Sequence, residues 1–139
     1  MLRQQPKRVL VCGSRDWQER SIIRAELGLL ASKPNPPVII HGAARGADTL
    51  AGQIAEGYGL TVERFPADWD THGKRAGILR NLAMLDTEPD LVLAFRKGES
   101  RGTQHTVSEA MRRGIPTRVY VADHYYSHFH VEESEPIHA

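Results

Sequence analysis

Three short segments of the sequence combine glycine with arginine, and this combination is suited to holding a phosphate group. They lie at residues 13–17, 42–48 and 98–103, and each precedes a stretch with helical periodicity. Glycine lets the backbone turn sharply and approach a ligand closely, while arginine offers a planar fork that matches phosphate oxygens. The free N–H groups at the start of a helix favour anions. The candidate ligand-binding residues in these segments are Gly13, Ser14, Arg15 and Asp16, then Gly42, Ala43, Arg45, Gly46 and Asp48, and finally Gly98, Arg101, Gly102 and Thr103.

The segments around these residues predict alternating strands and helices. Short apolar runs indicate strands at residues 9–12, 38–41, 60–65, 90–95 and 118–122, and helical periodicity predicts helices at 19–32, 48–58, 74–86 and 103–113. Strands that alternate with helices form right-handed crossover units around a parallel sheet. In such a sheet every strand-to-helix loop lies on one edge, so the three glycine segments should meet there.

The fold class that follows is α/β: a single Rossmann-like, doubly wound domain with a mainly parallel five-stranded sheet flanked by helices. We assign residues 1–122 to this domain and residues 123–139, which are rich in histidine and glutamate without a clear period, to a C-terminal tail. The expected inward faces are Leu79, Leu82, Ala83 and Leu85 on helix 74–86, and Val107, Ala110 and Met111 on helix 103–113.

Both tryptophans, Trp17 and Trp69, fall in loops of the same edge. An aromatic ring beside a phosphate site can stack on a nucleobase, or it can pack over a helix end as a hydrophobic lid. The sequence leaves both interpretations open for both residues. We include Trp69 among the candidate ligand-binding residues.

Composition excludes several classes of function. The formal net charge is +1, from 18 basic and 17 acidic residues, whereas a protein that binds duplex nucleic acid usually carries a basic excess. Cys12 is the single cysteine, so no disulfide forms within the chain. The apolar run at residues 9–12 is too short for a signal sequence or a membrane span, which predicts a cytoplasmic protein with no membrane partner.

No cofactor or metal is expected from the motifs. None of the glycine segments has the spacing of a dinucleotide fingerprint or a Walker loop. Four histidines close to the end of the chain are the obvious metal ligands, but their spacing fits no defined site; they are His124, His128, His130 and His138.

The ordered motifs at residues 11–15 (VCGSR), 41–48 (HGAARGAD), 76–81 (AGILRN) and 101–103 (RGT) resemble the YspA-like, YpsA-related branch of the SLOG superfamily. That superfamily joins the DNA-processing protein Smf/DprA and the LOG phosphoribohydrolases. The resemblance covers about residues 9–121. It implies a Rossmann-like fold whose glycine loops hold a nucleotide or a nucleotide-like ligand, and a homodimer by analogy with the LOG enzymes.

LOG enzymes cut the N-glycosidic bond of nucleoside monophosphates with an arginine and a glutamate. The resemblance places Arg80 at the arginine position, followed by Asn81 where those enzymes have lysine. At the glutamate position this chain has Thr106. Glycoside chemistry needs a carboxylate near the ribose, and Glu109 lies one helical turn further on. Arg80 and Glu109 are therefore the candidate catalytic residues.

Three other carboxylates, Asp16, Asp48 and Asp68, lie in edge loops and are better placed near a ligand, although Asp48 is also a natural helix cap. The sequence thus predicts binding of a phosphate-bearing, nucleotide-derived small molecule at the C-terminal edge of the sheet, for sensing or for processing. Hydrolysis of a nucleoside 5'-monophosphate and binding of single-stranded nucleic acid stay open as alternatives. The balanced charge argues against the second of them.

Overall fold

Five parallel strands form the body of the sheet, as predicted from the sequence. The computed structural model describes residues 5–122 and the backbone of residues 129–134. The strands are β1 (Arg8–Gly13), β2 (Val38–His41), β3 (Val62–Arg64), β4 (Leu91–Lys97) and β5 (Thr117–Ala122), and the order across the sheet is β3-β2-β1-β4-β5-β6. The chain builds outward from β1 to β3 and then returns to place β4 beside β1. The direction of winding therefore reverses between β1 and β4, where open α/β sheets bind ligands.

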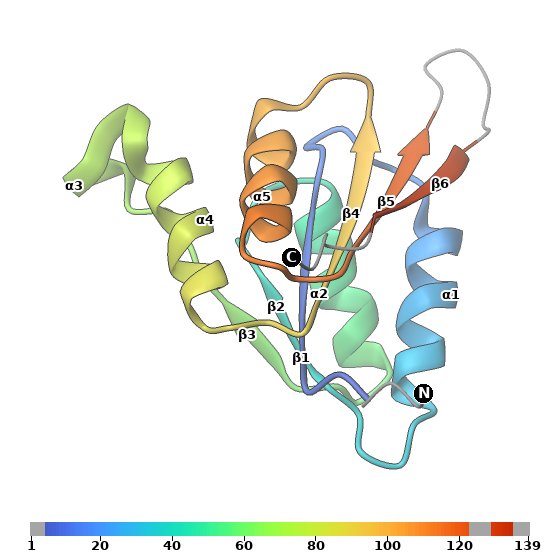
Figure 1. Ribbon diagram of the computed structural model, residues 1–139. Helices are drawn as coiled ribbons and strands as arrows, with labels where there is room; N and C mark the ends of the chain where they lie inside the picture. The colour runs from blue at the N-terminus through green and yellow to red at the C-terminus, as the bar shows by residue number, and fades with distance from the viewer. Residues whose placement is uncertain (1–4, 123–128, 135–139) are drawn as a thin grey trace.

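Helices cover both faces of the sheet (Figure 1). On one face lie α1 (Arg20–Ala31) and α2 (Ala47–Gly57), and on the other lie α4 (Ala76–Asp86) and α5 (Arg101–Arg112). A short helix, α3 (Trp69–His72), and a single 3-10 turn, η1 (Gly73–Arg75), connect β3 to α4. The predicted doubly wound arrangement is therefore confirmed.

The apolar strand residues alternate between two cores because successive side chains of a strand point to opposite faces. Val9 and Val11 pack under α1 and α2, whereas Leu10 and Cys12 pack under α4 and α5. Strands buried on both faces read as continuous apolar runs, which explains why the runs in the sequence located them.

Two predicted helix faces differ from those in the structure. Ala83 is exposed on α4, where Met84 and Leu85 are buried, and Met111 on α5 is 38% exposed. The buried face of each helix is rotated because polar side chains near the cleft, Asn81 on α4 and Thr106 on α5, are also buried. A prediction of the buried face from apolar residues alone does not detect this rotation.

A sixth strand, β6 (Phe129–Ser134), lies in the segment that the sequence assigned to a tail. It pairs antiparallel with β5, from Thr117 opposite Ser134 to Ala122 opposite Phe129. Its alternation of Phe129 and Val131 with polar residues is the signal that the richness in histidine and glutamate concealed. The histidines at 124, 128 and 138 lie outside the described residues.

None of the helices within the described residues is both long enough and apolar enough to cross a membrane.

Candidate functional site

A polar cleft lies at the carboxyl ends of β1 and β4, at the point where the sheet reverses its winding. Its volume is about 440 Å³, within the range of small-molecule sites. All three glycine segments contribute to its wall, as the parallel sheet predicted. The predicted residues that line it are Gly13, Ser14, Arg15, Asp16, Arg45, Asp48, Arg80, Arg101, Gly102 and Thr103, and they are joined by Cys12, Ala44, Asn81, Met84, Glu99, Ser100 and Thr106.

The first glycine loop is fastened to the end of β4. The Ser14 N–H donates to the carbonyl of Phe95 (2.8 Å), and Ser14 Oγ accepts a hydrogen bond from the N–H of Lys97 (2.8 Å). A Cβ at Gly13 would lie 2.2 Å from the Phe95 carbonyl oxygen, so only glycine fits there. Ser14 is buried, and its hydroxyl already has a structural partner in β4.

The second glycine loop contacts the first through Gly46. This residue has φ 81 and ψ −125, a conformation that is open essentially to glycine alone. A Cβ at Gly46 would lie 2.4 Å from the carbonyl oxygens of Ser14 and Arg15. The neighbouring N–H of Ala47 donates to the Ser14 carbonyl (3.2 Å), so α2 begins directly against the first loop.

The buried side chains of Asp48 and His41 accept hydrogen bonds from the backbone of the second loop. Asp48 Oδ2 accepts from the N–H groups of Gly42 (3.0 Å) and Ala44 (3.3 Å), and His41 Nδ1 accepts from the N–H of Ala43 (2.9 Å). Asp48 was a candidate cap for its own helix, but its carboxyl instead accepts hydrogen bonds from the loop that precedes the helix. Burial raises the pKa of its carboxyl to about 6, although these amides and the nearby Arg80 lower it.

Arg80 and Asn81 connect the second loop to the third. Arg80 Nη1 donates to the Gly42 carbonyl and Arg80 Nε donates to Asn81 Oδ1 (2.8 Å). Asn81 Nδ2 in turn lies 3.5 Å from the Gly102 carbonyl. A Cβ at Gly42 would lie 2.6 Å from Arg80 Nη1, so glycine makes room for the guanidinium. Asn81 also lines the cleft, although its position in the sequence motif predicted no role for it.

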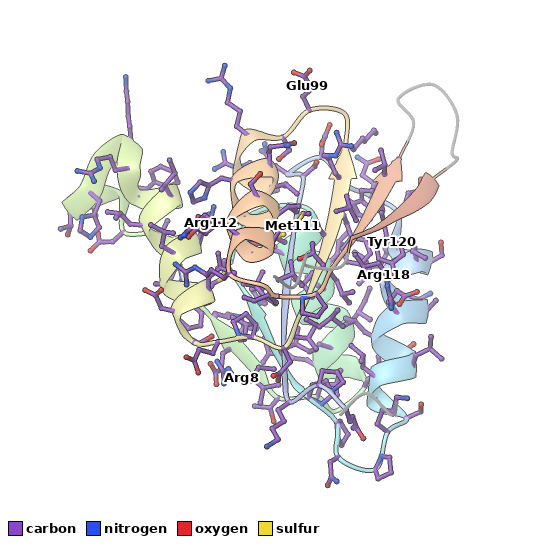
Figure 2. All side chains as sticks on the ribbon, viewed as in Figure 1. Arg8, Glu99, Met111, Arg112, Arg118 and Tyr120 are labelled. Carbon is purple, nitrogen blue, oxygen red and sulfur yellow. The ribbon has the colours of Figure 1, made fainter. Side chains whose placement is uncertain are left out.

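The third loop leads into α5. Ser100 caps this helix, since its Oγ accepts from the N–H of Thr103 (3.4 Å) and lies 2.8 Å from Thr103 Oγ1. Thr106, which the resemblance places at the LOG glutamate position, lines the cleft and donates to the Gly102 carbonyl (3.2 Å). Glu99 lies at the outer end of the loop and points away from the sheet (Figure 2).

Four arginines, Arg15, Arg45, Arg80 and Arg101, line the cleft. None of the four forms an ion pair within the part of the chain that the structure describes. Other arginines do have such partners, for example Arg8 with Glu63 at 2.8 Å. Arg80 already uses Nη1 and Nε within the protein, whereas Arg15, Arg45 and Arg101 make no side-chain hydrogen bond to a described residue. The guanidinium donors of these three arginines therefore suit an anionic ligand.

A second hollow of about 370 Å³ adjoins the cleft. It contains three further predicted residues, Gly42, Ala43 and Trp69, and it shares Arg15, Arg45 and Arg80 with the cleft. The predicted residue Gly46 lines neither of these two hollows. Trp69 is 50% exposed. Trp17, by contrast, is 1% exposed and packs against Phe95 with ring centroids 5.5 Å apart, which supports the packing interpretation for that residue.

Glu109, Gly98 and Asp68 are not brought to the cleft. Glu109 lies about 12 Å along α5 from Arg101, at 1.5 Å per residue. Hydrogen bonds from Arg112 and Arg113 lower the pKa of Glu109 to about 2. Gly98 forms the turn after β4 with φ 62, and Asp68 caps α3 by accepting from the N–H of Thr71 (3.1 Å). Asp16 and Asp48 are the aspartates that line the cleft.

Cys12 lines the cleft but is buried at the end of β1. Burial raises the pKa of its thiol far above the ordinary value, which keeps the sulfur protonated. No group of three histidine, cysteine or acidic residues within the described ranges could hold a metal ion.

The fold and the cleft define a Rossmann-like α/β protein with an arginine-lined site at the switch point of its sheet. Residues 7–72 match the model of the YspA, cpYpsA-related SLOG family, and the chain belongs to that family. The sequence is 44% identical to the Gene 61 protein of Mycobacterium phage D29 over 116 residues, which cover 79% of this chain and 93% of the phage protein. The resemblance inferred from the motifs is therefore confirmed.

Among solved structures, the chain is similar to DNA processing protein A (DprA) from Streptococcus pneumoniae. The TM-score is 0.67 at 20% sequence identity, and the match covers 80% of this chain but only 49% of DprA. The chain thus spans about half the length of DprA, and the two proteins share the fold. Membership of the SLOG family supports a role connected with nucleotides or nucleic acids.

Proposed function

We propose that the protein binds a phosphate-bearing nucleotide, or a ligand derived from one, in the cleft at the C-terminal edge of the sheet. The observation that carries this proposal is a set of four arginines in one polar cleft that form no ion pair with any residue the structure describes: Arg15, Arg45, Arg80 and Arg101. The start of α5 adds free N–H groups to the same wall, and glycine at residue 102 leaves the backbone accessible. The oxygens of a phosphate group match such donors in charge and geometry.

A thermal-shift panel tests the proposal. It contains nucleoside mono-, di- and triphosphates, dinucleotides and ADP-ribose. A ligand at one hundred times its dissociation constant adds about 2.7 kcal/mol to the free energy of unfolding, which raises the melting temperature by several degrees. We expect Arg45→Ala to weaken binding of the active compound by about tenfold or more, since hydrogen bonds to charged groups contribute about 1.5–3 kcal/mol.

Arg24→Ala is the matched control, because Arg24 is an exposed arginine of α1 that lines none of these hollows. It should leave binding unchanged. If no phosphate compound shifts the melting temperature, or if Arg45→Ala and Arg24→Ala behave alike, the proposed cleft is refuted. Single-stranded oligonucleotides belong in the same panel, because salt-sensitive binding to them alone would favour the nucleic-acid alternative.

Gly102→Ala separates binding from stability at the start of α5. A Cβ at this position would meet nothing within 4 Å, so the folded protein should tolerate the methyl group and gain up to about 1 kcal/mol of helix propensity. We expect ligand affinity measured by calorimetry to fall at least about tenfold, because the methyl group occupies the space through which a phosphate reaches the backbone. Equal affinity in this variant and the wild type would show that the ligand does not approach Gly102.

Hydrolysis of an N-glycosidic bond is a second candidate function, and Asp48 is the residue that favours it. Its carboxyl lines the cleft with Arg80, whereas Glu109 lies outside it. Asp48 Oδ2 is engaged by two backbone amides, and its pKa of about 6 suits a group that exchanges protons near neutral pH. Release of free base from a nucleoside 5'-monophosphate would support this function. If no nucleoside 5'-monophosphate releases its base in the presence of the protein, hydrolysis is excluded.

A further inference from the structure

The second hollow differs from the cleft because an aromatic residue lines it. Its wall includes Trp69 together with Ala43, Pro66 and Ala67. The same wall also contains the three arginines that it shares with the cleft, Arg15, Arg45 and Arg80. The two hollows therefore meet at one cationic wall, with an aromatic ring on one side and the start of α5 on the other.

Trp69 is held in place while much of its surface stays free. It is the first residue of α3, whose start is fixed by the hydrogen bond from the Thr71 N–H to Asp68. The ring rests against the first turn of α4, because a Cβ at Gly77 would lie 3.5 Å from Trp69 Cη2. Half of the residue is nevertheless exposed, whereas tryptophan is highly buried on average. A positioned and half-exposed indole beside a cationic wall is suited to receive a planar partner.

We propose that this hollow is a nucleobase subsite, in which the base of a nucleoside 5'-phosphate stacks on Trp69 while its phosphate contacts the shared arginines. The inference rests on the proposed function and deepens it, because it specifies a ligand that has a base in addition to a phosphate. Stacking tolerates every base, since each has a π-face. The larger purine ring system gains more contact with the indole, so purine nucleotides should bind tighter than pyrimidine nucleotides.

The experiment compares two probes, adenosine 5'-monophosphate and ribose 5-phosphate, by isothermal calorimetry. The second probe keeps the sugar and the phosphate but has no base. Stacking on an aromatic side chain corresponds to about 5- to 150-fold in affinity. We expect the wild type to bind the nucleotide tighter than the sugar phosphate by a factor in this range. Trp69→Ala should reduce nucleotide affinity to the level of the sugar phosphate and leave the sugar phosphate unaffected.

Two further variants complete the design. Trp69→Phe keeps an aromatic face and should retain part of the preference for the nucleotide. Leu29→Ala removes an exposed apolar side chain of α1, 62% exposed, and should change neither affinity. Nucleotide should also change the fluorescence of the wild type but not that of Trp69→Phe, because the remaining Trp17 is buried in the core.

The outcomes distinguish the two proposals. If both probes bind with equal affinity, or if Trp69→Ala keeps the nucleotide preference, the nucleobase subsite is refuted while the phosphate cleft stands. If neither probe nor any other phosphate compound binds, the proposed function fails, and the subsite fails with it.

Discussion

Replacing Gly46 with alanine is expected to lower the free energy of unfolding by about 3 kcal/mol or more. The backbone of Gly46, with φ 81 and ψ −125, is strained for any residue with a Cβ, at about 1–3 kcal/mol. The added Cβ would also lie 2.4 Å from two backbone carbonyl oxygens, which cannot yield without separating the first and second glycine loops. Overpacking of this kind costs about a further 1–3 kcal/mol.

Chemical denaturation measures this change, and the melting temperature should fall by roughly 10 °C. Gly57→Ala is the matched control, because Gly57 is the last residue of α2, and a Cβ there would meet nothing within 4 Å. That variant should be unchanged or up to about 1 kcal/mol more stable. Similar stability of Gly46→Ala and Gly57→Ala would show that the contact between the two loops does not constrain the fold.

Replacing Asp48 with alanine is expected to destabilise the protein by about 2–4 kcal/mol at pH 4.5, where the Asp48 carboxyl is largely protonated and its cost of ionisation is small. The substitution leaves the N–H groups of Gly42 and Ala44 without their carboxylate acceptor, and an unsatisfied buried donor costs about 1–3 kcal/mol. It also removes the carboxyl group that raises the pKa of the half-buried Arg80 against the lowering effect of burial. Asp48→Asn keeps an oxygen that can accept the same two hydrogen bonds, so it should destabilise the protein less than Asp48→Ala does.

The pH dependence of these variants tests the ionisation of Asp48. Its folded pKa of about 6 lies above the ordinary 3.8, so the folded state prefers the protonated carboxyl. The cost of ionisation is present in full above pH 6, and it is relieved as the pH falls from 6 towards 4. A pKa shift from 3.8 to about 6 corresponds to roughly 3 kcal/mol in the free energy of unfolding.

Denaturation of the wild type and Asp48→Asn at pH 8 and pH 4.5 isolates this contribution, since groups common to both proteins cancel in the difference. The free energy of unfolding of Asp48→Asn, measured relative to that of the wild type, should be about 1–3 kcal/mol higher at pH 8 than at pH 4.5. A difference that stays constant with pH would show that Asp48 titrates near its ordinary value in the folded state.

The sequence predicted which segments meet at the cleft. Buried parallel strands are continuous apolar runs, and glycines mark their ends, so the five strands and the four main helices could be located from local pattern alone. The parallel arrangement then required the loops at residues 13–17, 42–48 and 98–103 to share an edge. The family motifs added Arg80, which lies on α4 and belongs to none of these loops.

The sequence could not decide what each side chain in these loops contacts. Trp17 and Trp69 occupy similar places in the pattern, yet one is a core residue and the other borders a hollow. Asp48 resembles a helix cap in sequence, but its carboxyl accepts hydrogen bonds from the backbone of the preceding loop. Glu109 lies one turn beyond Thr106, and this one turn is enough to carry it out of the cleft towards Arg112 and Arg113. These differences depend on distances of a few ångströms between segments that are far apart in the sequence.

The sequence by itself therefore determined the sheet, the order of the elements and the edge on which the arginines gather, because these follow from local periodicity and from the handedness of crossover connections. Tertiary structure alone decided that Gly46 joins two loops, that Asn81 connects Arg80 to Gly102, and that residues 129–134 extend the sheet. Close packing sets these contacts, and packing depends on the whole arrangement of neighbouring atoms, which no short stretch of sequence encodes.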